Sequence, residues 1–306
     1  MRILFFVSIL LTCYNLQSQV INEDLVSKHI SYLSSDELEG RKSGTRGIEL
    51  AAQYIEKEFE RIGLKTFNSE DYRQNFESRG LNLFNIIGLL EGKEKPNEYI
   101  VISAHYDHIG INEDIEGDNI FNGANDNASG TTAVLLLAKH YKELDSNSRS
   151  ILFVLFTAEE MGLIGSRYFG EKINPESIIA GINIEMIGKE SPFGEKTAWL
   201  TGFDRSDFGK IVQKNLEGSE YKLYPDPFID YKLFYRSDNA ALARLGIPAH
   251  TFSTSPMDKD LDYHKVTDEV STLDMYTITE TIKAIATGTS SLISGEDTPT
   301  RISIDE

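Results

Sequence analysis

An apolar run that ends in two adjacent acidic residues constrains the fold of this chain more than any other feature. Residues 151–157 read Ile-Leu-Phe-Val-Leu-Phe-Thr, and this richness in β-branched and aromatic side chains predicts a strand buried on both faces. Glu159 and Glu160 stand at its exit. Ligands of open α/β sheets bind beyond the carboxyl ends of the strands. The two carboxylates are therefore candidate site residues, and since adjacent side chains point in different directions, one can bind a metal while the other transfers protons.

Two further strand ends carry side chains that ligate metals. The apolar run 99–104 leads into His105, and Asp107 follows two residues later. A metal-binding histidine usually donates its other ring N–H to a carboxylate, which is a role that suits Asp107. A third predicted strand, residues 181–188, contains Glu185 among apolar neighbours, where an unpaired charge is costly.

Two loops extend this set of ligands. The small-residue turn 122–130 contains Asp126 and precedes an apolar helix predicted over residues 131–141, and the late segment 262–268 contains His264. Carboxylates mixed with imidazoles suit zinc or a similar divalent ion. Five ligands are too many for one catalytic zinc with an open position, but they match two metals that share a bridging carboxylate.

The remaining histidines are interpreted as supporting residues. His108 and His250 lie near the expected crevice and are assigned to its surroundings or to the core rather than to the ligands. His29 and His140 fall on predicted helices and are expected at the surface.

Taken in order, these motifs resemble those of the M28 family of zinc metallopeptidases, which includes bacterial aminopeptidases, glutamate carboxypeptidase and the glutaminyl cyclases. The resemblance covers about residues 34–268, and residues 33–41 (Leu-Ser-Ser-Asp-Glu-Leu-Glu-Gly-Arg) are typical of bacterial members. It rests on five motifs: His-x-Asp at 105–107, Gly-x-x-Asp-Asn-Ala-Ser-Gly at 123–130, the pair 159–160, the acid at 185 before Met-Ile-Gly, and Tyr-His at 263–264.

The resemblance implies a site with two zinc ions. Asp126 would bridge the ions, His105 and Glu185 would complete one coordination group, and Glu160 and His264 would complete the other. It also implies a cis peptide bond between Asp126 and Asn127. The family usually has Asp where this chain has Glu185, so a one-metal site is the alternative.

The resemblance also implies an activity, the hydrolysis of N-terminal residues from peptides by a metal-activated water. Glu159 would act as general base, Asp107 would orient His105, and Tyr263 or the nearby Tyr235 would donate a hydrogen bond to the oxyanion. The segment 236–240 resembles a family stretch that lines the specificity pocket.

Other activities on the same scaffold are a glutaminyl-peptide cyclotransferase with one zinc and a carboxypeptidase. The cyclases carry an extra, often Trp-bearing insertion after the paired acids, whereas here residues 161–166 follow directly and the only tryptophan is Trp199. No basic cluster is committed to a C-terminal carboxylate. A catalytically silent relative would lack Glu159 or Asp126, and this chain has both.

Strands and helices alternate along most of the chain, which predicts an α/β fold: a single three-layer αβα domain with a mixed, mostly parallel central sheet, as in zinc exopeptidases. The domain is expected over residues 19–294, followed by a polar and loose C-terminal tail over 295–306. The strands predicted at 85–90 and 100–104 are expected to form a hairpin across the turn 91–96.

Residues 1–18 are predicted to be a signal peptide, with Arg2, an apolar stretch over residues 3–12 and the small Ser18 before a plausible cleavage point. The expected location is the periplasm or the exterior. The only cysteine, Cys13, lies in this segment, and lipid anchoring there is the alternative, although Thr12 stands where a smaller residue is usual. The net charge of −18 argues against nucleic-acid binding, and no later segment is long and apolar enough to span a membrane. The expected partner is a peptide substrate, and nothing in the sequence indicates an oligomeric state.

Overall fold

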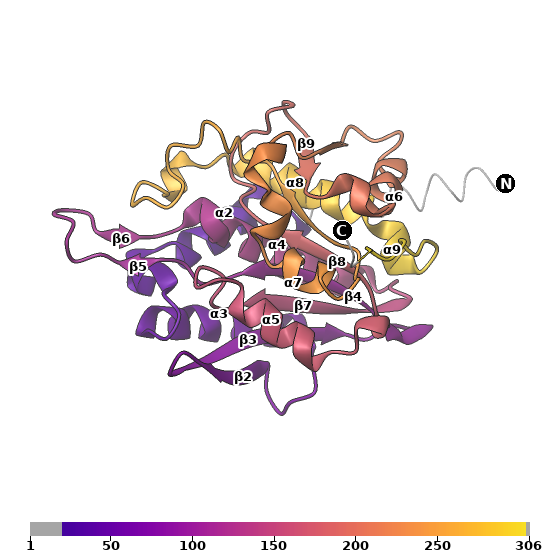
Figure 1. Ribbon diagram of the computed structural model, residues 1–306, viewed down its shortest axis with the longest axis horizontal. Coiled ribbons are helices and arrows are strands. Elements are labelled where there is room, and N and C mark those ends of the chain that lie inside the picture. The colour runs from indigo at the N-terminus through magenta and orange to yellow at the C-terminus, as the bar shows by residue number, and fades with distance from the viewer. Residues whose placement is uncertain (1–19, 304–306) are drawn as a thin grey trace.

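A mixed β-sheet runs through the middle of the molecule (Figure 1). The computed structural model describes residues 20–303, so the predicted signal peptide lies outside the described residues. Within that part of the chain, nine strands form the sheet, in the spatial order β1-β3-β7-β4-β8-β11-β9-β10, with β2 paired to β3. Their bounds are β1 Lys65–Thr66, β2 Arg73–Ser78, β3 Leu81–Leu90, β4 Lys95–His105, β7 Arg149–Phe156, β8 Ile178–Ile184, β9 Thr197–Leu200, β10 Lys222–Pro225 and β11 Ala249–Ser253.

The centre of this sheet is parallel and its margins are mixed. Strands β7, β4, β8 and β11 are mutually parallel, whereas β3 pairs with β7 in the antiparallel sense. The expected hairpin between β3 and β4 is therefore wrong, because β7 lies between them. Residues 100–104 of β4 and most of β7 are apolar and buried on both faces of the sheet. Strands of this kind occur in parallel sheets that are covered on both faces, with a neighbouring strand on each edge.

Helices cover both faces of the sheet, as the sequence predicts (Figure 1). On one face α2, α3, α4 and α8 pack together over the larger core, and on the other α5 and α7 enclose a smaller one. The bounds of the helices are α2 Glu23–Leu33, α3 Arg46–Ile62, α4 Gly130–Leu144, α5 Ile164–Lys172, α6 Phe208–Asn215, α7 Asn239–Ala243, α8 Met275–Gly288 and α9 Ser290–Ser294.

Strand β7 shows how the sequence sets these layers. Its alternate side chains divide between the two cores: Ile151, Phe153 and Leu155 face the larger one, and Leu152 and Val154 face the smaller one. All are 0% exposed. Burial of each such side chain is worth about 1.5–3 kcal/mol, so β7 is held firmly and fixes the position of the acidic residues that follow it.

Helix α3 illustrates how the helix ends are encoded. Ile55 and Phe59 belong to its apolar stripe and are buried in the larger core. Gly63 ends the helix in the left-handed conformation with φ 78°, and its N–H reaches the carbonyl oxygens of Phe59 and Glu60. A glycine at this position is a common helix ending, because it adopts the left-handed conformation without a steric cost.

Two expectations about the surface are wrong. His29 and His140 are buried, because they lie on helix faces that pack against neighbouring elements, and His29 Nδ1 is 2.8 Å from the hydroxyl of Tyr54. The segment 295–303 is not loose: Ile302 is buried and its N–H donates to the carbonyl of Gly246. Within residues 20–303, no helix has the length and apolar character needed to cross a membrane.

Candidate metal centre

The carboxyl ends of the central parallel strands bring the expected site residues together. His105 is the last residue of β4, Glu159 and Glu160 follow β7, and Glu185 follows β8. Asp126 comes from the short helical turn η2 (Ala124–Ser129), which precedes α4. His264 comes from the long connection between β11 and α8. This is the edge where open α/β sheets bind their ligands.

One candidate ligand group consists of His105, Asp126 and Glu185. Each offers one ligand atom, and the three atoms all lie within 4.8 Å of one another. His105 Nε2 is 3.2 Å from Asp126 Oδ1, yet neither atom is aligned for a hydrogen bond within the described residues. Glu185 Oε2 is also buried without a hydrogen-bond partner there. The three side chains therefore converge on a common point, as ligands of one ion do.

A second group shares Asp126. His264 Nε2 is 3.2 Å from Asp126 Oδ2 and 3.2 Å from Glu160 Oε2. His108, Asp126 and Glu160 also offer atoms within 4.8 Å of one another, with His108 Nδ1 2.9 Å from Glu160 Oε1. From the sequence, His108 is expected in the surroundings of the crevice or in the core. The structure brings its ring into this group, beside His264 at a centroid distance of 5.9 Å.

The donor set fits a divalent cation. Buried polar atoms without partners cost free energy, and a cation placed between them would remove that cost. Although burial opposes ionisation of Asp126, the imidazoles of His105 and His264 hold its pKa well below the usual range. Burial raises the pKa of Glu185 to about 7. Imidazole nitrogens combined with carboxylate oxygens are the ligands of catalytic zinc.

The turn that carries Asp126 is held by its neighbours. The peptide bond between Asp126 and Asn127 is cis, as the resemblance implies. Both oxygens of the Asp268 carboxylate accept main-chain N–H bonds, from Asn125 at 2.8 Å and from Asp126 at 3.0 Å. The Asn127 amide donates to the carbonyl of Ile184 at 3.0 Å, so the turn is tied to the end of β8. Sequence reasoning missed this function of Asp268, because its contact spans more than 140 residues.

Asp107 contacts both His105 and the turn that carries the paired acids. His105 Nδ1 is 3.1 Å from the main-chain oxygen of Asp107 and 3.8 Å from its carboxylate. That carboxylate accepts hydrogen bonds from the N–H of Glu159 at 3.1 Å and from the Ser43 hydroxyl at 3.3 Å. Burial raises the pKa of Asp107 to about 7. Asp107 therefore links the end of β4 to the turn after β7.

Glu159 differs from its neighbour Glu160 in its surroundings. Glu160 belongs to the second ligand group, whereas Glu159 belongs to neither. Burial raises the pKa of Glu159 well above its ordinary value. The preceding Ala158 has φ 54°, a left-handed conformation that non-glycine residues rarely adopt. The chain therefore changes direction between the end of β7 and the two carboxylates.

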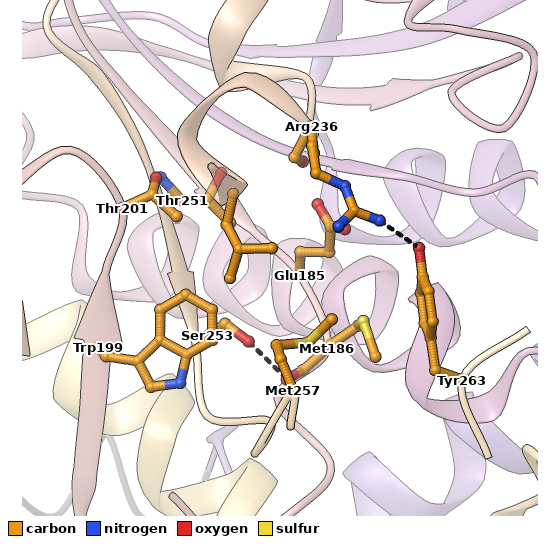
Figure 2. A pocket seen from close by; sticks show the side chains of 11 residues that line it. Glu185, Met186, Trp199, Thr201, Arg236, Thr251, Ser253, Met257 and Tyr263 are labelled. Carbon is orange, nitrogen blue, oxygen red and sulfur yellow. Dashed lines mark hydrogen bonds between the residues drawn. The ribbon is translucent and has the colours of Figure 1, made fainter. Parts of the chain in front are cut away.

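A pocket opens beside Glu185. Figure 2 shows Arg236 and Tyr263 facing each other across its side, where an Arg236 Nη atom donates to the Tyr263 hydroxyl at 3.4 Å. The Tyr263 ring also stacks on His264 at a centroid distance of 3.9 Å. The hydroxyl of Tyr235 instead accepts a hydrogen bond from Arg205 at 2.6 Å. Of the two candidate tyrosines, Tyr263 is the one that lines the pocket. Its apolar walls are Met186, Trp199, Leu233 and Met257.

Comparisons with known proteins give a family and a fold. A model described as peptidase family M28 matches residues 85–289. A "Probable zinc metalloprotease" of Pyrenophora teres f. teres is 28% identical over 179 residues, which is 55% of this chain and 37% of that protein. "Aminopeptidase YwaD" of Bacillus subtilis is 32% identical over 108 residues, 34% of this chain and 22% of that protein. The chain thus spans well under half the length of these curated relatives.

Solved structures show the same architecture. A zinc aminopeptidase from Bacillus subtilis superimposes with a TM-score of 0.73 at 15% identity, covering 93% of this chain and 98% of that one. At this level of identity the likeness concerns the fold. The zinc exopeptidase-like αβα fold expected from the sequence is confirmed.

Proposed function

The chain belongs to peptidase family M28, and we propose that it is a zinc-dependent aminopeptidase that removes N-terminal residues from peptides. The observation that carries the proposal is the pair of ligand groups that share Asp126, with Glu159 beside them but outside both. The similarity to proteins titled as zinc metalloprotease and aminopeptidase supports it.

Two zinc ions would be held by residues on either side of Asp126. His105 and Glu185 would hold one ion, and Glu160 and His264 the other. His108 lies close enough to Glu160 to bind this second ion in place of His264 or together with it. When bound, zinc polarises a carbonyl group and lowers the pKa of water.

Glu159 is the proposed general base. Its raised pKa suits a group that takes up a proton and later returns it to the departing amine. Asp107 holds the Glu159 N–H at 3.1 Å and so fixes the turn from which the carboxylate acts. The Tyr263 hydroxyl lies at the pocket beside Glu185, where it can donate to a developing oxyanion.

The excess of carboxylates at the site favours a substrate with a free amino terminus. Asp126, Glu159, Glu160 and Glu185 place carboxyl oxygens at one end of the pocket. A free α-amino group is positive at neutral pH, and these oxygens can accept its hydrogen bonds. The side chain of the first residue would then enter the pocket bounded by Trp199 (Figure 2).

A panel of substrates tests the proposal. The purified protein with zinc should hydrolyse aminoacyl fluorogenic amides and peptides with free amino termini, and should leave N-acetylated versions of the same peptides intact. A peptide that begins with Gln tests cyclisation, and one blocked at its amino terminus with a free C-terminus tests carboxypeptidase action. Cleavage of blocked peptides, or cyclisation without hydrolysis, would replace the proposed activity by one of those alternatives.

We also propose that the chain is exported, on the basis of residues 1–18 alone. Fractionation of cells that express the full chain should recover it outside the cytoplasm in a form shortened near Ser18. Substitution of Cys13 by Ala separates the two routes, because it would abolish membrane association only if that cysteine were lipidated.

A further inference from the structure

Arg41 is a buried cation that the proposed reaction does not use. It ends the short helical turn η1 (Asp36–Arg41) and is only 1% exposed. All four acceptors of its guanidinium are main-chain carbonyl oxygens. Nε donates to Tyr106 at 2.9 Å, one Nη donates to Asn122 at 2.7 Å and to Leu33, and the other donates to Gly123 at 3.0 Å.

Three of these carbonyl groups belong to segments that carry the candidate ligands. Tyr106 follows His105 directly, and Gly123 stands three residues before Asp126. The main-chain oxygen of Arg41 also accepts a hydrogen bond from the N–H of His108 at 3.2 Å. The guanidinium therefore connects the end of β4 to the Asp126 turn. The fourth carbonyl, that of Leu33, anchors this connection to the end of α2.

The surrounding backbone leaves little room for adjustment. A Cβ on Gly40 would lie 2.5 Å from the carbonyl oxygen of Phe121, and one on Gly123 would lie 2.5 Å from the ring of His108. Arg41 itself has φ 50°, in the region that disfavours non-glycine residues. The segment around Arg41 thus packs closely against the loops that contain Phe121 and His108. A displacement of the Arg41 side chain would therefore move these loops.

The charge of Arg41 also acts on the site. Burial lowers its pKa to about 10, while Asp268, Asp126 and other site carboxylates oppose that shift. The guanidinium therefore stays positive at neutral pH and offsets part of the negative charge of the ligands. Lysine would keep the charge, but its single ammonium cannot reach four carbonyl groups in a fixed plane.

We propose that Arg41 is a positioning residue of the metal centre: its fork of hydrogen bonds fixes the separation of His105 and Asp126 and thereby sets the affinity for zinc. The inference rests on the proposed function, because it presupposes that these residues bind zinc. It gives a physical reason for the Leu33–Arg41 motif, whose final arginine no catalytic step requires.

The test is zinc binding by the metal-free full chain, measured by calorimetry with a competing chelator. Arg41→Lys, which keeps the charge, and Arg41→Gln, which keeps two donors, should each weaken zinc binding roughly 10–100-fold, the range seen when partners behind metal ligands are removed. Arg149 provides a matched control, since it is equally buried but donates to Glu98 and to the carbonyls of Leu292 and Asp297, at the opposite end of β7.

Arg149→Lys and Arg149→Gln should lower the melting temperature, as the Arg41 variants should, and leave zinc affinity within about twofold of the wild type. Wild-type affinity in Arg41→Lys would overturn the inference, and so would an equal loss of affinity in the Arg149 variants, because Arg41 would then act only through general stability. If the wild-type chain itself binds no zinc, the proposed function fails and this inference fails with it.

Discussion

Strand β7 carries buried polar groups at both of its ends, and the two ends differ in how these groups are paired. At the amino end, Arg149 donates to the Glu98 carboxylate, to two main-chain carbonyls and to the Thr298 hydroxyl. At the carboxyl end, Glu160 Oε1 lies 2.9 Å from Nδ1 of His108, which follows the neighbouring strand β4, but the two atoms are not aligned for a hydrogen bond. Both are buried without a hydrogen-bond partner among the described residues. Paired groups stabilise the fold, whereas unpaired ones cost stability and are retained where function needs them.

The largest expected effect comes from removing the proposed general base at the unpaired end. Glu159→Gln should lower kcat by about two to four orders of magnitude, because the amide cannot take up the proton that the proposed general base removes. Bound zinc should stay nearly unchanged, because Glu159 belongs to neither ligand group. Steady-state kinetics and metal analysis of the same preparation check both statements. Loss of zinc together with activity would make Glu159 a ligand.

The unpaired atoms at the carboxyl end of the sheet are expected to accommodate two ions. If His105, Asp126, Glu160, Glu185 and His264 are all ligands, metal analysis should approach two zinc ions per chain. Glu185→Ala should then retain one ion and lose most activity, because only the group on the β8 side is affected. A wild-type chain with one firmly bound zinc and full activity would show that the Glu185 group is not used.

Local sequence pattern predicts strand β7 itself but not its neighbours in the sheet. The strand 151–157 and the acids after it follow from local pattern, and the structure has β7 at Arg149–Phe156. The order of strands does not follow from local pattern, because the placement of β7 between β3 and β4 depends on edges contributed by distant segments. The predicted hairpin failed for that reason.

Within the site, the sequence identifies side chains more reliably than their partners. The candidate ligands come from short motifs, and the structure brings them together. The contribution of His108 depends on which way its ring points. Apart from the Arg41–Leu33 bond, the contacts of Arg41 and Asp268 with the site join segments 65 to 143 residues apart. No local pattern reports such contacts, because main-chain carbonyls and N–H groups occur at every residue.

His250 contrasts with His108, because both of its ring nitrogens have hydrogen-bond partners. His250 Nδ1 is 2.9 Å from the carbonyl oxygen of Thr201, its Nε2 is 2.8 Å from the Ser206 hydroxyl, and its ring stacks on Phe208. It lies in the core, as expected, and burial lowers its pKa to about 4. Because the folded-state pKa lies below the unfolded value of about 6.5, its contribution to stability is present above that pH and is lost as the pH falls toward 4.

Lowering the pH from 7 to 5 should reduce the free energy of unfolding by about 2 kcal/mol through the protonation of His250 in the unfolded chain. Urea unfolding of the metal-free protein at the two pH values measures the change, and the difference between wild type and His250→Gln isolates the share of this residue. The variant should be less stable at pH 7 but lose less on acidification. An identical pH dependence in both proteins would show that His250 is not the titrating group.

The smallest expected effect concerns the loop that carries His264. Lys189 follows β8 closely, and its ammonium pairs with the carboxylates of Asp262 and, at 3.5 Å, Asp260. It therefore ties that loop to the sheet two residues before His264. Lys189→Met should weaken the binding of the ion at the Glu160–His264 group about tenfold and affect the other ion less, because His264 lies two residues from Asp262. The Asp126 turn keeps its own hydrogen bonds to Asp268 in the same loop. Lys196→Met is the matched control, since Lys196 pairs with Glu220 away from the site. Equal weakening of both ions would mean that the loop supports the whole centre, and the two ligand groups would then not be independent.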